Sequence, residues 1–85
     1  MDKVSIEQLE SLVFAPQKLR DARLKRFPAP EWSLRRVAKE LLNIKPQTLS
    51  QYETGKAIPG AILLMRMSFL YDVDARELTQ IDLEV

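Results

Sequence analysis

The segment from Pro46 to Thr54 presents uncharged hydrogen-bonding side chains at helical spacing. At about 100° per residue, Ser50, Gln51 and Thr54 all fall within about 60° of Gln47 around a helix axis. A helix face that only meets water more often bears lysine and glutamate, which are stronger helix formers. A glutamine amide can instead pair with N6 and N7 of adenine in the major groove of DNA. The face therefore suits base recognition, and the alternative is a surface helix that is merely polar.

The opposite side of this predicted helix would anchor it. Leu49 and Tyr52 lie on that side and can pack against a core. Pro46 suits the first helical position, where its missing N–H removes no hydrogen bond and its fixed φ is already helical. Gly55 marks the C-terminal end. The pattern therefore predicts a helix over 46–54 with one polar and one anchoring face.

A second helix is predicted immediately before this one. Ser33 is placed to cap it, and Trp32 precedes the cap, where it can pack against Val37. Asn43 is the expected left-handed residue that ends the helix. The predicted buried stripe consists of Val37, Ala38 and Leu41. Two short helices joined by a tight turn form a helix-turn-helix pattern.

The remaining segments also favour helices. Ser5 and Gln8 fit a capping box for a helix that extends to about Phe14. Further helices are predicted over 16–26 and over 61–71, and a short one is predicted to start near Asp74 and pass through Leu78. Helix 61–71 is apolar nearly all round, so it is predicted to form the buried centre. The expected fold class is all-α, a compact bundle of five to six short helices that includes an extra N-terminal helix.

Composition excludes several classes of function. The chain has 85 residues, with no cysteine and no histidine, the residues that most often bind zinc or act as a general base. No metal site, cofactor or small-molecule ligand is indicated, and an enzyme is not expected. No apolar run approaches the roughly 18 residues of a membrane span, and the N-terminus lacks the features of a signal peptide. The prediction is a cytoplasmic protein with no membrane partner.

Charge is unevenly distributed along the chain. Residues 18–56 contain ten lysines and arginines against four acidic residues, a net charge of +6, whereas the whole chain has +1. Residues 1–17 and 57–85 are both net acidic. A basic middle segment favours a polyanion as partner. Ordinary solvated helix faces are the alternative, and charge alone leaves the two explanations equally open.

The motif SLRRVAKEL … TLSQYETGKAIP resembles the lambda-repressor-like, Xre/Cro-type DNA-binding family. That family has a capping Ser or Thr, an apolar–Ala pair, an apolar residue, a turn, then Ser-x-aromatic/aliphatic-Glu-x-Gly and a proline. The matching residues are Ser33, Val37, Ala38, Leu41, Ser50, Tyr52, Glu53, Gly55 and Pro59. The resemblance covers residues 18–80, which implies a single helix-turn-helix domain over 1–85. Residues 1–17 would add an N-terminal helix, and residues 81–85 would form an extended tail.

Two departures mark the chain as a divergent member, as expected of a regulator from a phage or mobile element. The stretch between Ala38 and Leu49 is one residue longer than the family spacing, and Asn43 replaces the usual turn glycine. The segment FPAPEW, residues 27–32, lengthens the preceding connection. The longer turn at 42–45 predicts a tilted or shifted recognition helix.

The resemblance implies a role for each matching residue. Gln47 and Gln51 match base-reading positions, and Ser50 lies between them on the same face. Lys45, Thr48 and Thr54 match positions that touch bases or phosphates around this helix, and Ser33 matches a capping position close to a phosphate. Lys56 is a further candidate for a backbone or flanking contact. Three cations could add phosphate contacts or simply form a solvated helix face: Arg35, Arg36 and Lys39. Glu53 matches a position that pairs with an arginine of the first family helix, and Arg23 is the expected partner.

These features predict a sequence-specific transcriptional regulator that binds double-stranded DNA, with repression as its expected effect. One such domain reads only a half-site, so a homodimer is expected. Ile81, Leu83 and Val85 alternate with acidic residues in the tail, which is the predicted dimer contact. The tail could alternatively fold back on its own domain. The alternative function is a protein-interaction module on the same fold, such as an antitoxin-like protein or an adaptor.

Overall fold

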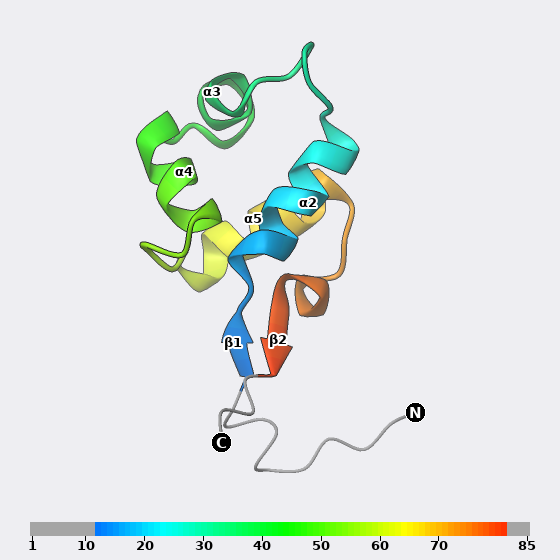
Figure 1. The fold of residues 1–85 in the computed structure, drawn as a ribbon, viewed down its shortest axis with the longest axis vertical. Helices are drawn as coiled ribbons and strands as arrows, with labels where there is room; N and C mark the ends of the chain where they lie inside the picture. The colour runs from blue at the N-terminus through cyan, green and yellow to red at the C-terminus, as the bar shows by residue number, and fades with distance from the viewer. Residues whose placement is uncertain (1–11, 82–85) are drawn as a thin grey trace.

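The computed structural model of the chain describes residues 12–81 (Figure 1). Its elements follow in the order β1 (Leu12–Phe14), α2 (Pro16–Arg26), α3 (Leu34–Arg36), η1 (Val37–Leu42), α4 (Pro46–Glu53), α5 (Ala61–Tyr71), η2 (Ala75–Leu78) and β2 (Thr79–Ile81). The helices form the body of the molecule, and the two short strands extend from one end of it (Figure 1). No helix in this part of the chain is long and apolar enough to cross a membrane.

The predicted all-α bundle of five to six helices is wrong. Residues 12–81 contain four α-helices, a π-helical segment that continues α3, one short 3-10 helix and a two-stranded sheet. Most of the predicted N-terminal helix lies outside the described residues, and its last three residues form strand β1 instead. The predicted helix that starts near Asp74 is a 3-10 turn of four residues, Ala75–Leu78, with a complete capping box.

The extended residue between β1 and α2 follows from the proline that comes after it. The residue before a proline is disfavoured in the α-region, and Ala15, which precedes Pro16, is extended with φ −111° and ψ 93°. A helix ending at Phe14 could therefore not continue into α2. Strand β1 pairs antiparallel with β2, with Leu12 opposite Ile81. The sheet thus brings the two ends of the described chain together.

Helix α3 continues as the π-helix η1, in which hydrogen bonds span five residues rather than four. Asn43, left-handed with φ 54°, ends η1, and its N–H donates to the carbonyl of Ala38. The buried face of Val37 and Ala38 therefore continues at Leu42, which is 6% exposed. Leu41 is 37% exposed, so its predicted burial is wrong. Each hydrogen-bonded turn of a π-helix contains one residue more than an α-helical turn, which equals the one additional residue of this chain relative to the family spacing.

One core cluster joins α2, η1, α4, α5 and η2. Its buried residues are Leu19, Val37, Ala38, Leu42, Leu49, Met67, Tyr71 and Leu78. Phe27 packs edge-on against Trp32 and Tyr71, with ring centroids 5.2 and 6.2 Å apart. These aromatic contacts hold the long connection between α2 and α3 against the core.

Helix α5 is buried on one side only, contrary to the prediction that it forms the centre of the domain. Met67, Ser68 and Tyr71 face inward. On the other side, Ile62 and Phe69 are among the most exposed large apolar residues of the described chain. Apolar composition alone does not distinguish a core-facing residue from one that faces solvent, which is why the prediction failed.

The strand at the C-terminal end begins two residues before the predicted tail. Thr79–Ile81 pairs with β1 of the same chain, so Ile81 contacts its own domain. Leu83 and Val85, the other apolar residues of the predicted dimer contact, lie outside the described residues. The same holds for residues 1–11, which include most of the predicted N-terminal helix.

Candidate nucleic-acid interface

Helix α4 has one face in the core and one toward solvent. Leu49 is fully buried, and Tyr52 packs partly against the core cluster. The four polar residues of the other face are exposed or half-buried: Gln47, Ser50, Gln51 and Thr54. A partner can therefore reach this uncharged face from one end of the helix to the other.

Backbone geometry defines both ends of α4. Pro46 occupies its first turn, and Lys45 is an extended N-cap residue with φ −69° and ψ 140°. After the helix, Gly55 has φ +79°, a left-handed conformation that favours glycine. A Cβ atom at Gly55 would lie 3.4 Å from Cγ of Pro16, so the turn also packs against the start of α2. The length of α4 is thereby fixed.

A buried ion pair connects α4 to α2. Arg23 donates from Nε to Oε2 of Glu53 at 2.6 Å and from Nη2 to Oε1 at 2.9 Å. The two side chains are only 7% and 3% exposed. A two-bond contact between arginine and carboxylate fixes direction as well as distance. It therefore sets the rotation of α4 about its own axis, and with it the direction of the polar face. This is the pairing that the resemblance implies.

Tyr71 of α5 lies near this ion pair. Burial, followed by the negative charge of Glu53, raises the pKa of the Tyr71 hydroxyl well above its usual range, whereas Arg23 acts in the opposite direction. Among the described residues, the hydroxyl oxygen has no hydrogen-bond partner. The phenol therefore remains neutral, as a buried polar group beside a charged pair.

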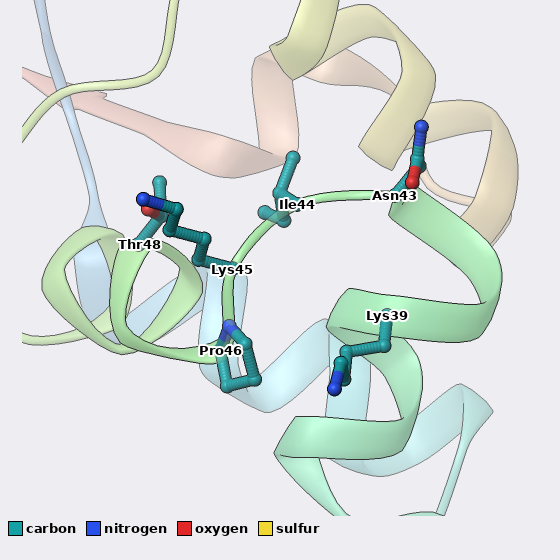
Figure 2. Close-up of a pocket in the computed structure, with 6 residues that line it drawn as sticks. All are labelled: Lys39, Asn43, Ile44, Lys45, Pro46 and Thr48. Carbon is teal, nitrogen blue, oxygen red and sulfur yellow. The ribbon is translucent and has the colours of Figure 1, made fainter.

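An open depression lies between η1 and the start of α4 (Figure 2). It is lined by Lys39, Asn43, Ile44, Lys45, Pro46 and Thr48. Lys39 lies on η1, and Lys45 and Thr48 lie at the start of α4, so the turn between the helices separates the two lysines (Figure 2). Two cations and a hydroxyl in this position suit the phosphate oxygens of a DNA strand.

The hydroxyls of Ser33 and Thr54, both predicted to contact DNA, already form hydrogen bonds at helix ends. One accepts its bond and the other donates it. Ser33 Oγ accepts a hydrogen bond from the backbone N–H of Arg36 at 3.1 Å, which caps α3 and leaves its O–H available as a donor. Thr54 Oγ1 donates to the carbonyl oxygen of Ser50 at 2.9 Å. Because phosphate oxygens only accept hydrogen bonds, Ser33 can bind one as it stands. Thr54 must first release its present bond.

Arg36 is largely engaged within the chain. Its Nε donates to Glu40 at 2.8 Å, and its Nη1 donates to the carbonyl oxygen of Glu31 at 2.9 Å. The guanidinium also lies over the Trp32 ring, 4.2 Å from the centroid. Arg36 is therefore a weaker candidate for phosphate contact than its exposed neighbour Arg35. Lys56, shortly after α4, is exposed as well.

Sequence reasoning missed Arg20. This exposed residue of α2 lines a second depression, together with Leu34, Ser50 and Thr54. The guanidinium is thus beside the polar face of α4, where it could reach a phosphate or a base edge. The signal in the sequence is the helical spacing, because Arg20 lies nearly one turn before Arg23, the partner of α4.

A family model described as helix-turn-helix matches residues 29–78, more than half of the 85 residues. The chain belongs to this helix-turn-helix family. The predicted lambda-repressor-like, Xre/Cro-type family is thereby confirmed. Comparison with curated proteins gives no match, and comparison with solved structures gives none either.

Membership of the helix-turn-helix family makes this chain a DNA-binding regulator. In such proteins, the second helix of the pair contacts base edges in the major groove, and α4 occupies the second position here. Arg23 precedes the matched segment, whereas Glu53 lies within it. The ion pair thus connects the matched segment to α2, which precedes it.

Proposed function

We propose that this protein is a transcriptional repressor that binds a specific double-stranded DNA site as a homodimer, with α4 in the major groove. The observation that most supports the proposal is the uncharged face of α4, oriented by the buried pair of Arg23 and Glu53. A chain that occupies its DNA site excludes other proteins from it, and this exclusion is the regulatory effect proposed.

Base recognition is assigned to Gln47 and Gln51, with Ser50 between them. The two amides lie one helical turn apart, so they can meet neighbouring base pairs along the groove. Each can bind N6 and N7 of an adenine. The Ser50 hydroxyl can hydrogen-bond to donors or acceptors on a base edge. The proposed site therefore contains adenines at adjacent or nearly adjacent positions of each half-site.

Phosphate contacts are assigned to groups that surround this face. Lys39 and Lys45 border the depression on opposite sides of the turn, and Thr48 lines it on the side of Lys45. Further contacts are proposed for Ser33, Arg35, Lys56 and Arg20. These groups would supply affinity that depends on salt rather than on sequence.

Selection of bound duplexes from a random oligonucleotide pool tests the proposal. We expect an enriched, two-fold symmetric motif, bound more tightly than a scrambled duplex of the same composition. Affinity should fall steeply with salt, by a factor on the order of 10³ between 50 and 200 mM if about six phosphates are contacted. Equal affinity for the enriched and the scrambled duplex would contradict the proposal.

A protein-interaction module is the second candidate, and the exposed apolar face of α5 favours it. Measuring the affinity for both duplexes at increasing salt separates the two functions. Binding to a protein through an apolar surface depends weakly on salt, and it would leave no preference among duplexes. The uncharged base-reading face of α4 has no role in that alternative, so we favour DNA binding.

A further inference from the structure

The outer face of α5 is apolar over two helical turns. Ile62, Met65 and Phe69 are 71%, 44% and 79% exposed, and they fall within about 60° around the helix axis. Arg66 is the charged residue on this face of the helix. Ile58, in the connection before α5, is 75% exposed. These four apolar residues, Ile58, Ile62, Met65 and Phe69, are called the α5 patch below.

The α5 patch is large for a chain of this size. With about 200 Å² of surface for each residue of this kind, the four side chains expose on the order of 500 Å². Apolar patches of about 300–600 Å² are the largest on typical monomers and are often functional. Two such patches in full contact would bury about 1,000 Å², the size of a weak specific interface.

We propose that the α5 patch binds the same patch of a second copy of this chain, so that two protomers pack α5 against α5 about a two-fold axis. The inference rests on the proposed function, because one helix-turn-helix domain reads a half-site and a second copy completes the site. A two-fold interface uses the same surface on both subunits. A single apolar stripe with Arg66 at its side fits that requirement without any complementary surface elsewhere.

The position of the patch favours a second copy over an unrelated partner. Ile58 lies in the connection between α4 and α5, so the patch begins close to the end of the base-reading helix. A two-fold axis through α5 would therefore bring the two α4 helices of a dimer into one assembly on neighbouring half-sites. Half-sites lie about 34 Å apart, one turn of DNA, and the two shorter dimensions of the protomer, 27 and 21 Å, are compatible with that spacing.

The predicted tail contact is the competing interface. Strand β2 already pairs with β1 of its own chain, so one of its two edges is occupied. Ile81 is 39% exposed, much less than Phe69 or Ile62. The described part of the tail thus presents less free apolar surface than α5 does.

Sedimentation equilibrium of the full chain without DNA tests the interface. We expect Phe69→Glu and Ile62→Glu to raise the dimer dissociation constant at least about 30-fold, because each change places two buried carboxylates in the contact. Leu24→Glu, on α2, is the matched control at an exposed apolar residue outside the patch, and it should leave the constant within about twofold. A variant without residues 82–85 tests the tail. Circular dichroism and thermal unfolding verify that each protomer folds.

Three results would overturn the α5 interface. One is a wild-type chain that stays monomeric at millimolar concentration, and another is a folded Phe69→Glu variant that dimerises as tightly as the wild type. The third is loss of dimer on removal of 82–85 while Phe69→Glu has no effect. DNA binding is measured separately with the selected duplex. A chain that dimerises through α5 but prefers no duplex contradicts the proposed function and leaves the interface standing.

Discussion

Helices α4 and α5 follow each other in the chain and both bury one face in the same core, yet their outer faces differ in chemistry. The outer face of α4 consists of amides and hydroxyls, whereas that of α5 consists of isoleucine, methionine and phenylalanine with one arginine, Arg66. The inner faces are alike, since Leu49 and Met67 are both fully buried. The inner faces are therefore determined by the needs of folding. The outer face of α4 suits the hydrogen-bonding base edges of a DNA groove, whereas the outer face of α5 suits an apolar partner surface.

The two helices are also fixed in different ways. Helix α4, with eight residues, is held by the buried Leu49 and in addition by the ion pair with Arg23. Helix α5 has eleven residues and is held by packing around Met67 and Tyr71. The directed contact suits a helix whose polar face must point in one direction. Apolar packing suffices for a helix that presents an apolar surface.

The largest effect is expected from breaking the ion pair that orients α4. Arg23→Ala or Glu53→Ala leaves the partner buried without its counter-charge, which should lower the free energy of unfolding by about 3–5 kcal/mol. Urea denaturation measures this loss. The double variant Arg23→Met with Glu53→Met is the control, because it leaves no buried charge and should lose much less. Single variants within 1 kcal/mol of the wild type would show that core packing alone holds α4.

Base recognition by α4 is tested by Gln47→Ala and Gln51→Ala. Each should fold as the wild type does, because both side chains point away from the core, and each should lose about 1–3 kcal/mol of discrimination between the selected and the scrambled duplex. Fluorescence anisotropy with both duplexes measures the difference. Gln80→Ala, at an exposed glutamine of β2 outside both of these faces, is the matched control and should keep the ratio. Unchanged discrimination in both glutamine variants would remove α4 from the base-reading role.

Much of the helix-turn-helix unit was predictable because local signals and tertiary packing agree there. Pro46 and Gly55 define the ends of α4, and Asn43 adopts the left-handed conformation expected of a helix end. The side chains that face the core alternate with those that face solvent at helical spacing. The partner of Glu53 could be named because the resemblance supplies a contact between residues that are distant in sequence.

The parts that could not be predicted depend on contacts or geometry that no local pattern encodes. Pairing of Leu12–Phe14 with Thr79–Ile81 joins opposite ends of the described chain. Leu41 and Leu42 are adjacent residues of the same type, and only the π geometry of η1 determines which of them is buried. Arg20 lies near α4 because α2 and α4 are packed together, and its sign in the sequence is indirect, a helical spacing from Arg23.

A smaller effect concerns the inner face of α5, where Tyr71 lies near the ion pair of α4. Tyr71→Phe removes a buried hydroxyl that has no partner within residues 12–81 and keeps the ring packed against Phe27. Because that hydroxyl is desolvated without a compensating bond, the substitution should raise the free energy of unfolding by about 1 kcal/mol. Thermal unfolding measures the change. A clear loss of stability would show that the hydroxyl has a partner in solution, and Tyr52→Phe, at a half-buried tyrosine, serves as the comparison.

The smallest change in stability is expected from shortening the π segment η1, which precedes α4. Deleting Leu41 would place Leu42 four residues after Val37, the spacing at which an ordinary α-helix returns to the same face. The segment could then become α-helical with the same buried residues, so stability should change by less than about 1 kcal/mol and α4 should keep its position. Deletion of Arg20 is the control. It removes a residue from the regular helix α2 and should unfold the protein, because it rotates Arg23 about 100° away from Glu53. Thermal unfolding and binding to the selected duplex measure both outcomes. If the Leu41 deletion unfolds the chain as the Arg20 deletion does, η1 is an integral part of the fold rather than the place where one additional residue is accommodated.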